Sequence, residues 1–300
     1  MKKLSIAVIT MNRARQLTEA IESCLRCDLP EETEFVIIDN ASTDETEQAV
    51  HKMAESCKYH IHYEKLPENL GVGGGRNYAY EKSMGEYVYV LDDDAVIDYE
   101  NNPDFFMRAL SVFEDFSDVV TLTTQIYDTA WKSDRVAPDG KEFAPGLYKL
   151  LMFYGGSHFL RKSFFTAPPY LPNKYGYEEI PPSLRAMSAK KINAYIPALR
   201  VIHKPAINKW DWGEEKNQAL LIKGHAIPFA IKKMMYPGVA RPLLHLANAR
   251  RRKLYLRDVP DAKVKIRAAA RQFIAEYPIK EKISLATLCR MFKDFKLSIF

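Results

Sequence analysis

Short apolar runs alternate with polar segments of helical periodicity along the first hundred residues. The runs are nearly continuous at 4–10, 35–38 and 87–91 and weaker at 61–66, with helix-period segments between them. Continuous apolar strands suit a parallel sheet that helices cover on both faces. The pattern therefore predicts an α/β fold with a doubly wound, mostly parallel central sheet.

Two of the segments between these runs carry further helix signals. One apolar stripe of a predicted helix consists of Leu17, Ala20, Ile21, Cys24 and Leu25. Cys24 and Cys27 form a Cys-x-x-Cys pair, but a zinc site would need a second convergent pair, so core packing is favoured. Ser42 and Glu45 have the spacing of a capping box, which predicts a helix start after the second run.

The 300-residue composition is that of an ordinary folded protein, and disorder is not expected. The apolar stretch after the basic start ends at Asn12, too short for a signal peptide or a spanning helix. Four cysteines without an export signal favour reduced thiols and a cytoplasmic protein. The net charge of +5 hides an asymmetry, because residues 216–300 hold 19 Lys or Arg against 5 Asp or Glu.

Three successive aspartates close the fourth apolar run. Because side chains alternate along a strand, Asp92 and Asp94 are expected to point one way and Asp93 the other. Two carboxylates on one face suit a hard divalent cation such as Mg²⁺ or Mn²⁺, which could in turn hold a diphosphate. The alternative for such a cluster is a solvated acidic turn.

Other polar residues also follow predicted strands, where open α/β sheets bind ligands. They are Thr10, Asn12, Asp39 and Asn40. The segment 69–77 adds four glycines and Arg76, which would let backbone amides and a fixed charge approach a phosphate. This segment opens the helix before the fourth strand, so it fits neither the dinucleotide fingerprint nor a phosphate loop of nucleotide triphosphatases, and a flexible helix start is the alternative.

Taken together, the segments 6–12, 36–46, 69–77 and 91–95 resemble the nucleotide-sugar half of a family 2 glycosyltransferase. The resemblance implies the GT-A fold, a nucleotide diphosphate sugar donor, and Mg²⁺ or Mn²⁺ between the Asp-x-Asp motif and the diphosphate. It implies that Asp39 reads the nucleobase. The nucleotide-sugar residues that it implies are Thr10, Asn12, Arg13, Asp39, Asn40, Asn69, Gly71, Gly74, Arg76, Asn77, Asp92 and Asp93. The metal ligands that it implies are Asp92, Asp94 and His203.

The resemblance continues into the second hundred residues. Segment 155–164 is similar to the family's glycine-led acceptor segment, and 177–185 resembles its acidic catalytic segment. Here the chain departs twice from the family pattern, because Glu179 stands where Asp is usual and Pro181 replaces the second Asp. A strand is predicted to end at His203, the family position that completes the metal or diphosphate site.

The function that follows from the resemblance is inverting transfer of a sugar to a glycan or lipid-linked acceptor. Glu179, or Glu178 beside it, would be the general base, and UDP is favoured over dTDP as the donor nucleotide. A non-catalytic sugar or nucleotide binding protein and a sugar-nucleotide hydrolase are the alternatives. The expected domains are a GT-A domain at 1–212, with a nucleotide-sugar half at 1–100 and an acceptor half at 101–212, and a basic helical appendage at 213–300.

The appendage contains the basic run 250–253, with leucines on either side of it. Such a segment could lie as an amphipathic helix against an anionic membrane surface, which would place the protein at the inner face of the membrane. The alternative is a solvated basic helix packed on the main domain. No recognisable nucleic-acid module surrounds these charges, so nucleic acid is not an expected partner.

Overall fold

The computed structural model describes residues 3–136, 139–174, 176–205 and 215–300. The described residues up to 205, apart from 187–189, form one compact unit, and residues 215–300 form a second one together with 187–189. The predicted domain boundary at 212–213 lies outside the described residues.

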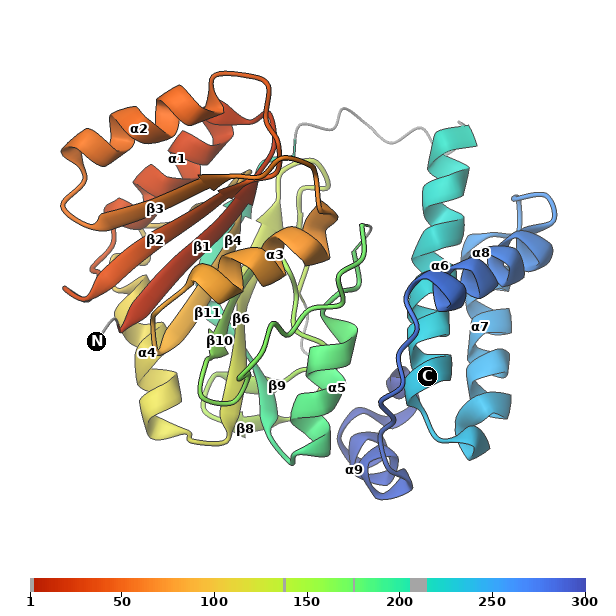
Figure 1. The fold of residues 1–300 in the computed structure, drawn as a ribbon. Coiled ribbons are helices and arrows are strands. Elements are labelled where there is room, and N and C mark those ends of the chain that lie inside the picture. Colours follow the sequence, from red (N-terminus) through yellow and green to blue (C-terminus); the bar gives the residue numbers. More distant parts are fainter. Residues whose placement is uncertain (1–2, 137–138, 175, 206–214) are drawn as a thin grey trace. The chain divides into compact units, whose positions relative to one another are not determined.

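In the described part of the chain, eleven strands form one sheet in the first unit (Figure 1). The strands are β1 (Leu4–Thr10), β2 (Thr33–Asp39), β3 (His60–Lys65), β4 (Tyr87–Asp92), β5 (Ala95–Ile97), β6 (Val119–Asp128), β7 (Ser133–Asp134), β8 (Glu142–Ala144), β9 (Leu147–Lys149), β10 (Ser157–Arg161) and β11 (Ile192–His203). The main path is β3-β2-β1-β4-β10-β6-β11-β9-β8, while β5 pairs with β11 and β7 pairs with β6.

The first four strands of this path are parallel, as the apolar runs predict. β1 pairs in parallel with β2 and β4, and β2 does so with β3. β10 then lies antiparallel between β4 and β6, and β6 pairs in parallel with β11. The sheet is therefore mixed, and the doubly wound, parallel arrangement holds for its nucleotide half.

Helices cover both faces of the sheet (Figure 1). The helices of this unit are α1 (Ala14–Leu25), α2 (Thr46–Ser56), α3 (Gly71–Lys82), α4 (Phe105–Asp115) and α5 (Ile180–Ser188). Because strand side chains alternate, Leu4, Ile6 and Val8 pack with α1, α2 and α4, whereas Ala7 packs with α3 and α5 on the opposite face. Cys24 and Cys27 are buried free thiols in the core that contains α1, α2 and α4, which confirms that they serve packing.

The start of α2 differs from the predicted capping box. α2 begins at Thr46, and no side chain caps it from the residue before. The Ser42 hydroxyl instead accepts a hydrogen bond from the Asn12 backbone N–H at 2.8 Å, and Asp44 accepts hydrogen bonds from the backbone and hydroxyl of Thr46. The predicted capping role of Ser42 is therefore wrong, because the turn after β1 uses its hydroxyl.

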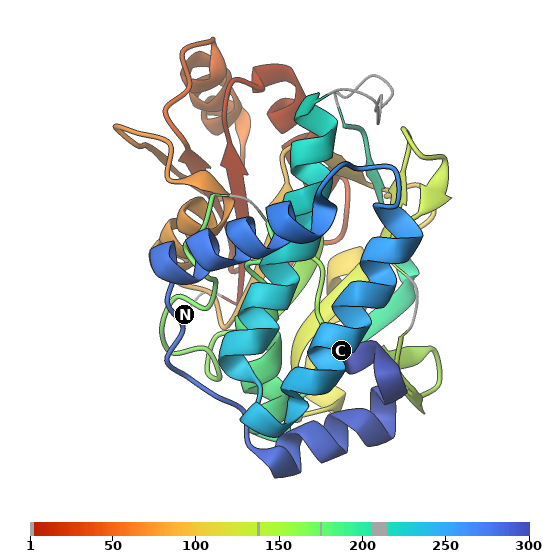
Figure 2. The same ribbon diagram turned by 90° about the vertical axis from the view of Figure 1, so that its right-hand side faces the viewer.

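The second unit is helical, as expected for the appendage. Its elements are α6 (Glu215–Met235), η1 (Gly238–Ala240), α7 (Arg241–Tyr255), α8 (Ala262–Glu276), α9 (Leu285–Phe295) and η2 (Lys296–Ile299). α6 packs against both α7 and α8, and Figure 2 shows α7 beside it and α8 crossing it. The Tyr236 hydroxyl donates to the carbonyl of Ile299 at 2.7 Å, which ties the end of α6 to η2. Among the described residues, no helix has both the length and the apolar character needed to span a bilayer.

Candidate active site

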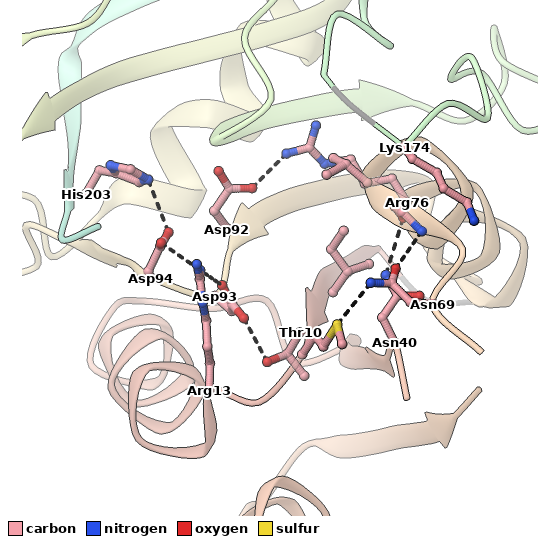
Figure 3. A pocket seen from close by; sticks show the side chains of 14 residues that line it. Thr10, Arg13, Asn40, Asn69, Arg76, Asp92, Asp93, Asp94, Lys174 and His203 are labelled. Carbon is pink, nitrogen blue, oxygen red and sulfur yellow. Dashed lines mark hydrogen bonds and ion pairs between the residues drawn. The ribbon is translucent and has the colours of Figure 1, made fainter. Parts of the chain in front are cut away.

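A cavity of about 430 Å³ opens where the carboxyl ends of β1, β2 and β4 meet the start of α3 (Figure 3). Parallel strands bring their ends to one edge of a sheet, so residues far apart in sequence meet there. The residues lining it are Ile9, Thr10, Met11, Arg13, Asn40, Asn69, Gly71, Val72, Arg76, Asp92, Asp93, Asp94, Lys174 and His203.

Asp92 ends β4, and Asp93 and Asp94 follow it in a turn; the three carboxylates differ in most of their partners. Asp93 accepts a hydrogen bond from the Thr10 hydroxyl at 2.8 Å and pairs with Arg13 at 2.8 Å. Burial raises the pKa of Asp93 to about 6, and the charge of Arg13 and the hydrogen bond from Thr10 offset part of that effect. Asp92 and Asp94 instead approach His203, since one donor atom from each of these three residues lies within 4.8 Å of the others.

Strand pairing places His203 at this position. It is the last residue of β11, and its Nε2 atom lies 3.1 Å from a carboxylate oxygen of Asp94. Burial raises the pKa of Asp94, but the hydrogen bond and charge of His203 outweigh burial and hold that pKa below its usual value. Burial likewise lowers the pKa of His203, and the Asp94 hydrogen bond and charge outweigh it, so the pKa is raised.

The set of Asp92, Asp94 and His203 fits a divalent cation. Carboxylate oxygens are ligands suited to Mg²⁺ and Mn²⁺, and imidazole nitrogen is a common metal ligand. Asp94 stays ionised because its pKa is lowered. Arg13 lies 2.7 Å from Asp94 and compensates part of the local negative charge.

A second cluster surrounds the buried guanidinium of Arg76. Arg76 pairs with Asp92 at 2.7 Å and with Glu179 at 3.1 Å, and it also pairs with Glu178. Burial raises the pKa of Glu179 to about 8; the charge of Glu178 raises it as well, and the charge of Arg76 opposes both. One side chain of α3 thus connects the end of β4 with the two carboxylates before α5.

Gly155 makes this second cluster sterically feasible. A Cβ atom built on Gly155 would overlap the carboxylate of Glu179 and the guanidinium of Arg76. The glycine-led segment that the sequence associates with the acceptor therefore also leaves room for the cluster of charges around Arg76.

The glycines at the start of α3 serve close packing in the same way. Gly71 has a φ of +74°, a conformation that favours glycine. A Cβ on Gly73 would overlap the carbonyl of Leu171, and one on Gly75 would approach the Asn40 amide at 2.8 Å. Gly71 also lines the cavity, and the expectation that these glycines let amides approach a phosphate stays a prediction.

Several predicted nucleotide residues support the cavity without lining it. Asp39 accepts hydrogen bonds from Ser42 N–H and the Tyr63 hydroxyl, at 2.7 and 2.8 Å. Asn12 accepts from Thr43 N–H, and Asn77 exchanges two hydrogen bonds with the backbone of Tyr170. Gly74 lies against Leu70. These four residues are not among those that line the cavity, and their nucleotide roles stay predictions.

The Glycosyl transferase family 2 model matches residues 5–167, which is more than half of the chain. The chain belongs to this family. The matched segment ends before Glu178 and Glu179, so the family assignment rests on the nucleotide half and on the elements from α4 to β10.

Two relatives share sequence segments with this family 2 chain. It is 35% identical over 124 residues to the poly(ribitol-phosphate) beta-N-acetylglucosaminyltransferase TarS of Staphylococcus aureus, covering 41% of this chain and 21% of TarS. It is 31% identical over 94 residues to the Campylobacter jejuni GalNAc(5)-diNAcBac-PP-undecaprenol beta-1,3-glucosyltransferase, covering 31% of this chain and 30% of that enzyme. The matches thus span less than a third of either relative.

Solved structures share the fold of this family 2 chain. S. aureus TarS 1–349 in complex with UDP-GlcNAc has a TM-score of 0.62 at 18% identity and covers 92% of this chain and 82% of its own. The Pyrobaculum calidifontis mannosyltransferase PcManGT in complex with GDP-Man and Mn²⁺ has a TM-score of 0.58 at 18% identity, covering 97% and 79%. These likenesses confirm the expected GT-A fold.

The site includes two residues that the sequence analysis did not predict. Lys174 lines the cavity beside Gly71, in an irregular segment that has no strand or helix period. Asp128 ends β6 and lies 3.0 Å from the Nδ1 atom of His203. The signal for Asp128 is its place at the end of segment 119–127, which is rich in the β-branched residues Val, Thr and Ile, since polar residues at strand ends are the ones to inspect.

Proposed function

We propose that this protein transfers a sugar from a nucleotide diphosphate sugar, UDP being favoured, to a hydroxyl of a glycan or lipid-linked acceptor with inversion. The observation that carries the proposal is that Arg76 connects the candidate metal ligands with the candidate bases. It pairs with Asp92, one of the candidate metal ligands, and with Glu179 and Glu178, the two candidates for the general base. Leaving-group stabilisation and proton removal are the two requirements of this reaction.

Asp92, Asp94 and His203 would hold Mg²⁺ or Mn²⁺ at the cavity. The ion would neutralise the charge that develops on the departing diphosphate. Asp93, held by Thr10 and Arg13, would keep the acidic turn in place. Lys174 lines the same cavity and would supply positive charge toward a diphosphate, whereas the charge of Arg76 is shared with its three carboxylate partners.

We assign the general base to Glu179. Its side chain is 9% exposed, against 1% for Glu178, so Glu179 is the more accessible carboxylate for an acceptor hydroxyl. A pKa of about 8 makes Glu179 a stronger proton acceptor than an ordinary glutamate while part of it stays ionised near neutral pH. Glu178, fully enclosed, would hold Arg76 in position.

The donor nucleotide is inferred from the relatives. TarS is solved with UDP-GlcNAc, whereas PcManGT is solved with GDP-Man, so the shared fold accepts different nucleotides. TarS is also 35% identical in sequence to this chain over 124 residues, and because TarS is solved with a UDP-sugar, this similarity supports UDP as the donor nucleotide.

An anionic membrane surface is the proposed docking partner of the second unit. Within that unit a groove of about 350 Å³ is lined by Leu243, Leu246, Ala247, Arg250, Arg251, Leu254, Tyr255, Leu297 and Phe300. Leu246, Leu254 and Leu297 are each at least 60% exposed. Exposed leucines beside arginines suit the interface of an anionic bilayer, where each basic residue adds roughly 1 kcal/mol. The undecaprenol-linked acceptor named for the C. jejuni relative makes such a surface relevant.

The membrane proposal is tested by sedimentation with vesicles that contain or lack phosphatidylserine. We expect binding to the anionic vesicles, lost in the double variant Arg250→Glu/Arg251→Glu. The matched control is Lys52→Glu/Lys58→Glu, which changes the net charge equally at exposed positions of the first unit. Equal binding to neutral vesicles, or an equal loss in the control, would show that the groove is not responsible.

The catalytic proposal is tested by incubating the protein with UDP-sugars, Mn²⁺ and candidate acceptors, and measuring both UDP and glycosylated product. EDTA and Asp94→Asn should each abolish turnover, while Asp118→Ala, at an exposed carboxylate, should keep it. Glu179→Gln should bind donor and fail to transfer. UDP release without product would indicate the hydrolase alternative, and donor binding without either would indicate a binding protein.

A further inference from the structure

His203 lies between two carboxylates because of strand pairing. β11 is paired with β5 on one side and with β6 on the other, and His203 is in register with Ala95 and with Asp128. Asp94 directly precedes Ala95, and its carbonyl accepts a hydrogen bond from the backbone N–H of Lys204. The register therefore sets Nε2 of His203 toward Asp94, at 3.1 Å, and Nδ1 toward Asp128, at 3.0 Å.

The carboxylate of Asp128 is itself fixed. Its Oδ1 atom accepts hydrogen bonds from the backbone N–H groups of Ala130 and Trp131, at 2.9 and 3.1 Å. Its Oδ2 atom is the one that faces His203, and the residue is 3% exposed. Thr129 also donates twice to the carbonyl of His203, at 3.0 and 3.1 Å, so the turn after β6 holds the histidine backbone as well.

We propose that Asp128 is the positioning residue of the metal site, which holds His203 with its hydrogen on Nδ1 and its Nε2 lone pair toward the cation. The inference rests on the proposed metal-dependent function and adds a residue to it. An ionised carboxylate only accepts hydrogen bonds, so each ring nitrogen can carry a hydrogen, Nδ1 toward Asp128 and Nε2 toward Asp94. A cation bound at Nε2 would take the place of the hydrogen there and leave the one on Nδ1, which faces Asp128. The remaining nitrogen then points to Asp92 and Asp94, where a cation would lie.

An asparagine at position 128 would reverse this arrangement. The backbone donors of Ala130 and Trp131 require an oxygen at Oδ1, so the amide nitrogen would face His203. An N–H group facing Nδ1 favours hydrogen on Nε2, which removes the lone pair from the metal side. Asp128→Asn thus keeps the shape of the side chain and changes which nitrogen of His203 is free.

The first test is a Mn²⁺ titration followed by electron paramagnetic resonance, with UDP present at a fixed concentration. Loss of the residue that hydrogen-bonds to a metal ligand typically weakens metal affinity 10- to 100-fold, so we expect Asp128→Asn to bind Mn²⁺ about 10- to 100-fold more weakly than the parent. His203→Ala gives the reference for a missing ligand. The matched control is Asp134→Asn in the same hairpin, where the carboxylate pairs with Arg200 and is 51% exposed. An Asp128→Asn affinity within about twofold of the parent would overturn the inference.

The second test measures directly which ring nitrogen of His203 carries hydrogen. In ¹⁵N correlation spectra with diamagnetic Mg²⁺, the His203 signal, assigned from His203→Ala, should show hydrogen on Nδ1 in the parent and on Nε2 in Asp128→Asn. Weaker metal binding with hydrogen still on Nδ1 would contradict the positioning role. If Asp128→Asn does not fold, Asp128→Glu keeps an acceptor and should bind Mn²⁺ more like the parent than like His203→Ala; the opposite result also overturns the inference.

These outcomes separate this inference from the proposed function. If the parent protein binds no Mn²⁺, the metal-dependent function fails. If the parent binds Mn²⁺ and Asp128→Asn binds it equally well, the function stands and the role of Asp128 is refuted.

Discussion

Replacing Glu179 with glutamine should stabilise the protein at alkaline pH while removing transfer. Burial raises the pKa of this carboxyl from 4.5 to about 8 in the folded protein, so its ionised form opposes folding. The destabilisation is absent below about pH 4.5, grows between pH 4.5 and 8, and is complete above pH 8. At 1.36 kcal/mol per pH unit, the full effect is of the order of 5 kcal/mol. Glutamine has no such ionisation and keeps nearly the same volume.

The assay is urea unfolding followed by circular dichroism at about pH 5 and about pH 9. The free energy of unfolding of Glu179→Gln should match that of the parent near pH 5 and exceed it by several kcal/mol near pH 9. Glu68→Gln, which removes a charge at an exposed position, should leave the pH dependence of the parent unchanged. A Glu179→Gln variant that is no more stable than the parent near pH 9 would refute the reasoning.

Three further predictions follow from the same site and its core. Because the base has to be ionised, kcat/KM of the parent should rise with pH through about 8, and a profile that is flat across this range would contradict the role of Glu179. Gly155→Ala should reduce transfer strongly through overlap with Arg76 and Glu179, whereas Gly238→Ala, which meets no atom within 4 Å, should keep activity in the same assay. Phe159→Ala should lower the free energy of unfolding by about 3–5 kcal/mol in urea, because its ring packs against four other buried aromatic rings; a loss below about 1 kcal/mol would argue against that packing.

The strands and the acidic turn could be predicted because their signals are local. Val36 to Ile38 and Tyr87 to Leu91 are buried on both faces of the sheet, so burial leaves a continuous apolar run in the sequence. The expected alternation of the three aspartates is wrong as the reason for their arrangement, because β4 ends at Asp92 and the next two aspartates lie in a turn, where Arg13 pairs with both.

The parts that sequence could not give depend on contacts between distant segments. Ser42 has the spacing of a cap, but the Asn12 backbone, thirty residues earlier, takes its hydroxyl. Lys174 lies in a segment without periodicity. Asp128 acquires its role only through the register of β6 with β11, which brings it beside His203. No spacing within one segment encodes such a pairing.

The position of Arg76 limits how this enzyme can be redesigned. One guanidinium pairs with three carboxylates from two separate segments, and glycine backbone lets the helix that carries it pack closely against the 171–173 loop. A substitution at the start of α3 that is intended to admit another donor would therefore also disturb Glu179, the proposed general base. Libraries aimed at a new sugar should instead vary Met11, which borders the cavity without joining that network of charges.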